Sequence, residues 1–162
     1  VASLVGSEMC IRDRNTVDRF WENKTLDELS HGEWEALCDG CGKCCLIKLQ
    51  DDQDDSVMYT NIICKNYNIK ESKCSDYKNR RSKVIDCVSV TSQNVQDFDW
   101  LPESCAYRLR ARGRSLPHWH HLVSGDKSAV HRLGHSVKGR VFLEGLVDSE
   151  ELETMIVKWV QV

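Results

Sequence analysis

The sequence predicts a single small α+β domain that consists mostly of short helices and contains one β-hairpin. A length of 162 residues is typical of one domain and is sufficient to bury a core. Two Ser/Thr-x-x-Glu signatures near the start of the chain mark the beginnings of short helices. Further along, two apolar runs rich in β-formers flank an acidic turn, which is typical of a hairpin.

Two consecutive capping boxes predict two short helices after residues 20–21. The second helix carries Trp34, which we expect in the core, and leads directly to Cys38. The pairs that form the boxes are Thr25 with Glu28 and Ser30 with Glu33.

A dense cysteine cluster, CDGCGKCC, follows at residues 38–45. Cysteines three residues apart across a tight turn place both sulfurs on one side, where a single ion can bridge them. Gly40 and Gly42 suit a backbone that folds around an ion, because they have no Cβ. Neighbouring side chains usually diverge, so we expect Cys45 either to serve a second centre or to be a spare thiol, and not to share an ion with Cys44. The cluster therefore predicts metal binding by Cys38, Cys41 and Cys44.

Four further cysteines are spread singly over the following sixty residues or so. A zinc ribbon would need a second Cys-x-x-Cys pair, which is missing here. Sulfur ligands without a nearby histidine favour an iron–sulfur cluster over a zinc or iron ion, and disulfides or reactive thiols are the remaining alternative. We expect one distal cysteine to complete the first centre and Cys45 to join the others. The predicted metal ligands are Cys38, Cys41, Cys44, Cys45, Cys64, Cys74, Cys87 and Cys105.

The hairpin is predicted from residues 46–49 and 57–60, which read as strands on either side of the acidic turn 51–55. The aspartates of this turn do not form an EF-hand calcium loop, because glycine and glutamate are missing from the required positions. We interpret them as a solvated tip.

Residues 61–90 show little apolar periodicity, so we expect them to owe their order to metal ligation more than to packing. A short helix is predicted around residues 76–82. Tyr77 and Arg80 lie one turn apart there, and we identify them as candidates for hydrogen bonding to thiolate sulfur around the metal. An ordinary exposed helix face is the alternative, and the sequence does not decide between the two.

A short helix is predicted for residues 91–97 and a longer one between Pro102 and Gly113. Cys105 falls in the first turn of the longer helix, where the helix N-terminus lowers a thiol pKa. The arginines of its second half are spread around the helix, so we interpret them as a solvated surface and not as a nucleic-acid interface. They are Arg108, Arg110, Arg112 and Arg114.

Three of the six histidines, His118, His120 and His121, lie next to Trp119 in the sequence. We regard His120 as a candidate cofactor-binding or acid/base residue, with a packed loop residue as the alternative.

The sequence then predicts a helix at residues 126–133, a strand at 137–143 and a last helix opened by Asp148 with Glu151. The last helix carries an apolar stripe that we interpret as core or as a dimer seam: Leu152, Met155, Ile156 and Trp159.

From Phe20 to its end, the chain resembles the YcgN-type (UPF0260) proteins, whose hallmark is the CxxCxxCC motif of a zinc- or iron-chelating domain. The resemblance implies metal chelation and residence in the bacterial cytoplasm. A related cluster occurs with an iron–sulfur centre in flagellin lysine methylases, but this chain is too short to carry that enzyme, so only the metal module transfers. His120 occupies the family's Trp-His-Pro segment, although His118 and His121 replace its tryptophan and proline. The matching stretches are FWENKTLDELSHGEWEALCDGCGKCC, CSDY, NR, DC, WLPESCAYRL, HWHHLVSGD and SVKGRV.

Composition excludes several classes of protein. A net charge of −3 gives no global attraction to nucleic acid or acidic lipid, so we expect neither as a partner. No apolar run approaches the roughly 20 residues of a membrane span. Nine cysteines are an odd number and too few for a disulfide scaffold of this length. We expect a monomer or a weak dimer, and a protein partner remains open.

The first fourteen residues have no periodicity and no place in the family pattern. We expect residues 1–14 to be a non-native or disordered extension and exclude Cys10 from the ligands. Residues 15–162 then form the cysteine-cluster domain.

These observations favour a small cytoplasmic cysteine-cluster protein with a structural, redox or sensing metal centre. The first alternative is an iron–sulfur-dependent redox enzyme or transferase that uses His120, although nucleotide-binding, radical and nucleophile–base motifs are missing. The second is a zinc-stabilised module that binds a partner. The sequence leaves enzymatic activity open.

Overall fold

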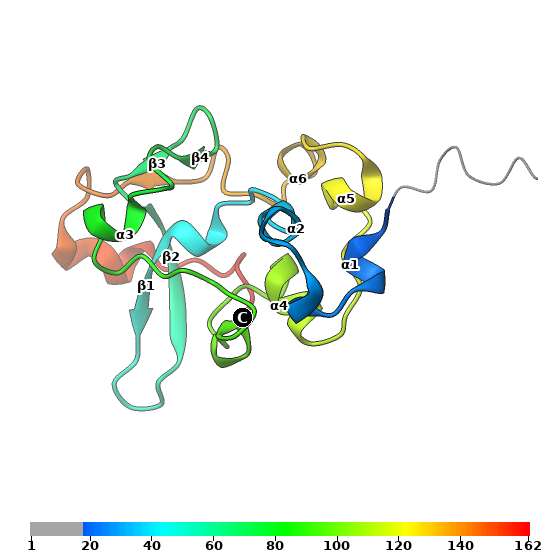
Figure 1. The fold of residues 1–162 in the computed structure, drawn as a ribbon. Helices are drawn as coiled ribbons and strands as arrows, with labels where there is room; N and C mark the ends of the chain where they lie inside the picture. Colours follow the sequence, from blue (N-terminus) through cyan, green and yellow to red (C-terminus); the bar gives the residue numbers. More distant parts are fainter. Residues whose placement is uncertain (1–17) are drawn as a thin grey trace, which may run out of the picture.

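The computed structural model describes residues 18–162, which form a mixed domain of short helices and small sheets (Figure 1). The expected extension at residues 1–14, with Cys10, lies outside the described residues. The strands are β1 (Leu46–Gln50), β2 (Val57–Ile63), β3 (Tyr67–Asn68), β4 (Lys73–Cys74) and β5 (Phe142–Leu143). The α-helices are α1 (Phe20–Asn23), α2 (His31–Ala36), α3 (Arg80–Lys83), α4 (Ala106–Ala111), α5 (His121–Ser124) and α6 (Ala129–Arg132), and the 3₁₀ helices are η1 (Leu26–Glu28), η2 (Lys43–Cys45), η3 (Val95–Asp97) and η4 (Ser149–Met155).

The predicted hairpin is confirmed as β1 and β2, which pair antiparallel from Leu46 opposite Ile63 to Gln50 opposite Val57. An irregularity in the register between Leu46 and Lys48 bends the pair. Strand β5 joins β2 in parallel and completes a sheet of order β1-β2-β5. A second sheet, β3 with β4, lies within the stretch where the sequence shows no β pattern.

The second capping box is formed as predicted. Ser30 Oγ accepts from the Glu33 N–H at 3.2 Å, and the Glu33 carboxylate accepts from the Ser30 N–H at 2.8 Å, so α2 begins at His31. The first box produces only the single turn η1.

Several predicted elements are shorter than the sequence suggested. The helix expected from Pro102 begins at Ala106, so Cys105 is its N-cap residue and does not lie in its first turn. The strand expected at 137–143 is limited to β5, and the helix expected at 76–82 is limited to α3. The last helix is the 3₁₀ helix η4, because the chain beyond it returns to β2, where Thr60 bridges Ile156 and the Val157 N–H donates to Tyr59 O at 2.8 Å.

The core consists of three apolar clusters, two of which have a residue of the cysteine turn, residues 38–45, packed against them. One cluster surrounds Trp34 and Leu37, a second lies on the sheet around Tyr59, and a third surrounds Trp119. Figure 1 shows the segment after α2, in cyan, passing from the helical half of the domain to β1. None of the helices in the described part of the chain has the length and apolar character needed to cross a bilayer.

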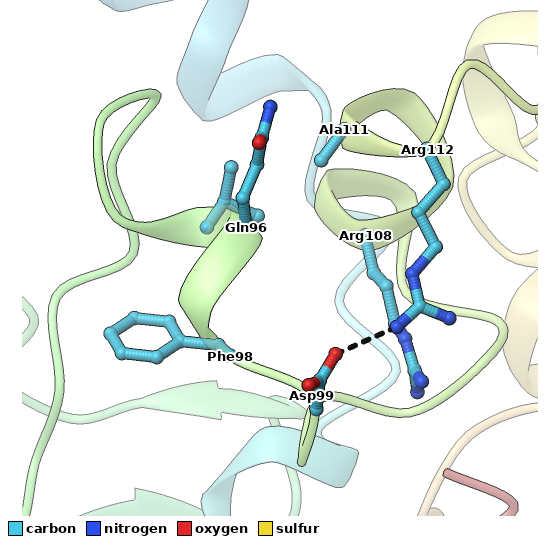
Figure 2. Close-up of a pocket in the computed structure, with 7 residues that line it drawn as sticks. Gln96, Phe98, Asp99, Arg108, Ala111 and Arg112 are labelled. Carbon is cyan, nitrogen blue, oxygen red and sulfur yellow. Dashed lines mark hydrogen bonds and ion pairs between the residues drawn. The ribbon is translucent and has the colours of Figure 1, made fainter.

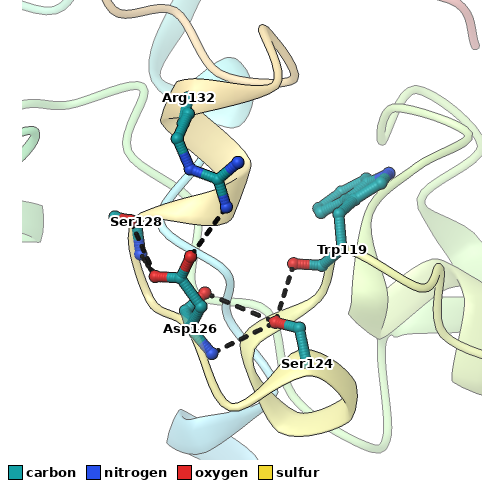
Figure 3. Close-up of polar contacts among 5 residues, drawn as sticks. All are labelled: Trp119, Ser124, Asp126, Ser128 and Arg132. Carbon is teal, nitrogen blue, oxygen red and sulfur yellow. Dashed lines mark hydrogen bonds and ion pairs between the residues drawn. The ribbon is translucent and has the colours of Figure 1, made fainter.

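The helical half is held partly by a polar network between α5 and α6 (Figure 3). Asp126 accepts from the Ser128 N–H at 2.8 Å and pairs with Arg132 at 2.9 Å, while the Ser124 hydroxyl donates to Trp119 O at 3.4 Å. Hydrogen bonds from Ser128 and Arg132 lower the pKa of Asp126 to about 2. The network fixes the loop that carries Trp119, against which Cys41 packs.

Replacing the α2 cap tests how far local capping supports the helix that leads into the cysteine turn. We expect Ser30→Ala to lower the free energy of unfolding by about 1 kcal/mol, because the Glu33 N–H loses its acceptor, whereas Ser30→Thr, which keeps a hydroxyl acceptor at the N-cap, should cost only a few tenths. Urea denaturation of the two variants measures the difference. Equal losses would show that the Ser30 hydroxyl does not cap α2.

Candidate metal centre

The cysteine turn is a sharply folded segment that links α2 to β1. The Cys38 N–H still donates to Glu35 O at 3.3 Å, and Asp39 Oδ1 then accepts from the Cys41 N–H at 2.9 Å. Gly40 and Gly42 have φ values of 74° and 76°, which are unfavourable for other residues. The two glycines reverse the chain twice, so four cysteines occupy one compact turn.

Gly42 also lies against the rest of the domain. A Cβ at this position would lie 2.6 Å from Tyr67 Oη and 2.8 Å from Val137 Cγ2. Nearby, the Val137 N–H donates to Cys41 O at 2.9 Å. The cysteine turn is therefore anchored to β3 and to the segment before β5.

The distal cysteines come from four separate places in the fold. Cys64 follows β2 and donates its N–H to Cys45 O at 3.0 Å. Cys74 lies in β4 opposite Tyr67, Cys87 follows α3, and Cys105 caps α4. All eight cysteines of residues 18–162 are free thiols, so the disulfide alternative is not what this structure shows.

Burial dominates the titration of the thiols around the turn. It raises the pKa of Cys38 and of Cys105 to about 12 each, and the charge of Cys44 adds to both shifts. It also raises the pKa of Cys41 well above its ordinary value. Taken without a cation, these groups are neutral thiols near pH 7.

Cys44 and Cys45 influence each other's titration. A hydrogen bond between them lowers the pKa of Cys44 to about 7 and raises that of Cys45. The charge of Lys48 favours the Cys44 thiolate further. The reason is local: both residues lie in the tight 3₁₀ turn η2, where the backbone curls more strongly than in a strand.

The residues present fit a thiolate-bound cation. The donors are soft sulfur atoms that raise one another's pKa, so a positive ion among them offsets a repulsion. Asp39 Oδ2 is buried beside them without a hydrogen-bond partner. Within residues 18–162, the structure shows no group of three or more His, Cys, Asp or Glu side chains placed to hold an ion, so the set of metal ligands stays a prediction.

Tyr77 and Arg80 contact each other and other parts of the fold, and no sulfur is among the hydrogen-bond partners found for them. The Tyr77 hydroxyl donates to Glu35 at 2.9 Å, and the Arg80 guanidinium lies 3.8 Å from the centre of the Tyr77 ring. The positive charge of Arg80 nevertheless acts against the burial that raises the pKa of Cys87. Their role around a metal stays a prediction.

His120 is buried, and backbone groups occupy both of its ring nitrogens. Nε2 lies 2.9 Å from Leu37 O, and Nδ1 accepts from the Leu122 N–H at 3.2 Å. Because Nδ1 accepts, Nε2 must carry the proton and donate to Leu37. Burial lowers the pKa of this imidazole. His120 thus fixes the residue that precedes Cys38, and in this state it has no ring nitrogen left for a ligand.

Three residues that sequence reasoning missed stand out beside the cysteines: Asp39, Lys48 and Asn66. Lys48 Nζ donates to Cys44 O at 2.7 Å, and Asn66 donates to two cysteine sulfurs. Asn66 follows Cys64 by two residues, and this Cys-x-Asn spacing was the only local signal.

A pocket of about 160 Å³ lies away from the cysteine ligands, between η3 and α4 (Figure 2). Arg112 pairs there with Asp99 at 2.8 Å. The neighbouring Arg108 is buried and donates to Leu101 O, so the interpretation of the arginines as a solvated surface is wrong for Arg108. Its side chain instead ties α4 to the preceding loop.

The comparison with known proteins decides the family. The family model CxxCxxCC, described as "Putative zinc- or iron-chelating domain", matches residues 37–106. A UPF0260 protein of Pseudomonas fluorescens strain Pf0-1 is 50% identical over 141 residues, which cover 87% of this chain and 95% of the relative. The chain belongs to the UPF0260 family.

Further UPF0260 relatives come from other bacteria. That of Parvibaculum lavamentivorans is 49% identical over 86% of this chain and 92% of its own length, and that of Ectopseudomonas mendocina is 51% identical over 85% and 93%. No solved structure matches the chain. The UPF0260 resemblance is thus confirmed, and the family model spans all eight cysteines named as ligands.

The packing of Gly42 predicts a contrast between two glycines of equal backbone conformation. Gly40→Ala should cost about 1 kcal/mol of unfolding free energy, because only its positive φ is disfavoured. Gly42→Ala should cost about 2 to 3 kcal/mol, since its methyl group also collides with Tyr67 and Val137. Chemical denaturation of metal-free protein measures both. A smaller loss for Gly42→Ala than for Gly40→Ala would contradict the close approach.

The buried imidazole of His120 predicts a pH dependence of stability. Its pKa in the folded chain lies below the ordinary 6.5, so the unfolded chain binds more protons as the pH falls below 6.5. The His120 contribution is fully present above pH 6.5 and declines as the pH falls toward the folded pKa. His120→Gln should flatten the profile between about pH 7.5 and 5.5. Urea titrations across that range test this, with the exposed His118→Gln as control, and an unchanged slope would refute it.

Proposed function

We propose that this UPF0260 protein is a cytoplasmic metal-binding protein whose cysteines hold an iron–sulfur cluster, with a zinc or iron ion as the alternative occupant. The observation that carries the proposal is the match of residues 37–106, which contain all eight predicted cysteine ligands, to a model described as a zinc- or iron-chelating domain. Cys64 bonds through its backbone to Cys45, and Cys105 acts electrostatically on Cys38. Sulfur-only donors suit both metals.

The same thiols support the cytoplasmic location. Ligating thiolates and free cysteines persist where thiols are kept reduced, whereas oxidising compartments convert them to disulfides.

The geometry does not favour the enzyme alternative built on His120. A general acid or base needs a ring nitrogen within reach of a substrate, and both nitrogens of His120 are occupied by Leu37 and Leu122. A partner-binding zinc module differs from the favoured iron–sulfur protein in its metal. Analysis of the bound metal therefore separates these two functions.

Metal analysis of protein purified without oxygen tests the proposal. We expect iron with acid-labile sulfide and a brown absorption that bleaches on reduction, because cysteine sulfurs are the ligands of iron–sulfur clusters and eight free cysteines are present. A colourless protein with zinc would select the alternative occupant. The triple variant of Cys38, Cys41 and Cys44 to serine is the control for bound metal. Protein with neither iron nor zinc would end the proposal.

A further inference from the structure

We propose that the pocket between η3 and α4 binds a small monocarboxylate with a short apolar chain. The pocket has a volume of about 160 Å³ (Figure 2). Because a water molecule occupies about 30 Å³ in the liquid, a molecule with a few carbon atoms fits this space. The lining combines two guanidinium groups, those of Arg108 and Arg112, with the apolar side chains of Val95, Phe98 and Ala111.

Arg108 is a buried cation without a counter-charge. The residue is only 7% exposed, and within residues 18–162 no carboxylate forms an ion pair with it. Its Nη1 donates to Leu101 O, whereas its Nε–H is buried without an acceptor. A buried charge without a partner is strongly unfavourable, and a buried donor without an acceptor adds to the cost. The carboxylate of a ligand would supply both the charge and the acceptor.

Arg112 lies one turn further along α4 and supplies the second guanidinium. Figure 2 shows both arginine side chains leaving the helix in the same direction, toward Asp99. Arg112 Nη2 pairs with Asp99 Oδ1 at 2.8 Å, so a carboxylate fits against this group. The two side chains of the pair are 42% and 86% exposed, and an ion pair so open to solvent contributes little to stability. A ligand can therefore share Arg112 with Asp99 or displace Asp99 at small cost.

The charges that line the pocket favour a monoanion. Arg108 and Arg112 carry two positive charges and Asp99 carries one negative charge, which leaves one positive charge to be balanced. A carboxylate balances it, whereas a phosphate dianion would leave an excess negative charge beside Asp99. Guanidinium groups bind carboxylates through paired N–H donors, which also orients the ligand.

The apolar part of the lining suits a short hydrocarbon chain and is already in place. Val95 belongs to the buried core cluster around Trp34, and Phe98 and Ala111 pack against that cluster. The Phe98 N–H donates to Val95 O at 3.3 Å, and the Leu101 N–H donates to Phe98 O at 3.2 Å. These bonds fix the backbone beside the pocket, so little conformational entropy is lost when a ligand binds.

Calorimetric titration of the full chain at low chloride concentration tests the pocket, with propionate as the probe. We expect saturable binding of one equivalent. Propionamide has nearly the same shape but no charge and should bind much more weakly, and so should inorganic phosphate. The absence of saturable propionate binding would overturn the proposal, as would propionamide binding of equal strength. Phosphate that binds as tightly as propionate would overturn the assignment to a monocarboxylate.

Variants outside the core locate the binding site. Arg112→Gln should weaken propionate binding about tenfold, because a charged hydrogen-bond donor is lost. Asp99→Asn should instead strengthen binding, because a competing carboxylate is removed. The control is Arg110→Gln, which removes the same charge from α4 outside the pocket lining and should leave the affinity unchanged. Equal losses for Arg110→Gln and Arg112→Gln would show a general attraction between charges and overturn the site.

NMR follows Arg108 without replacing it, since a variant would also lose the hydrogen bond to Leu101. The Nε–H resonance of Arg108 should shift during the propionate titration, with the same midpoint as in calorimetry. The Nε–H resonance of Arg110 should stay in place and serves as the internal control. Propionate binding that leaves the Arg108 resonance unshifted would place the ligand elsewhere and overturn the proposal.

Discussion

The close packing of the Gly42 backbone against Tyr67 and Val137 is the constraint on which the rest of the site depends. No side chain fits between these residues, so the turn between α2 and β1 lies directly against the small β3–β4 hairpin and the segment before β5. The positive φ of Gly42 turns Lys43 inward to Ser104 and starts η2. A single left-handed residue thus brings the cysteine turn into contact with both halves of the domain, each of which carries distal cysteines.

Local signals in the sequence predicted the elements whose stability is local. The Ser30 capping box and the alternating strands of the hairpin depend on residues a few positions apart, and both are found. The prediction of an α-helix for the last segment failed for the opposite reason, because that segment depends on a contact far away in the sequence. Its apolar spacing suits an α-helix, but Ile156 pairs with Thr60 nearly a hundred residues earlier, and this pairing ends the helical turn. Tertiary pairing overrides propensity where an open strand edge is available.

The same distinction applies to the site. The spacing of Cys38, Cys41 and Cys44 predicted a shared neighbourhood because a tight turn suffices to create it. The partners of the remaining thiols are set by contacts across the fold, such as Asn66 between Cys64 and Cys74. The contact of His120 with Leu37 O spans 83 positions, so no local pattern separates its structural role from a catalytic one.

Charge explains why such a site favours an occupant. Burial raises the pKa of Cys38 and Cys105 to about 12 each, and the charges of Cys44 and Asp39 add to both shifts. Against these groups strand β1 offers Lys48, whose own pKa is lowered by burial, and Asp39 Oδ2 has no hydrogen-bond donor. A bound cation would remove the protons from the thiols and supply the missing positive charge together. Metal affinity should therefore be coupled both to proton release and to the stability of the turn, since the unfolded chain holds no preformed set of sulfurs.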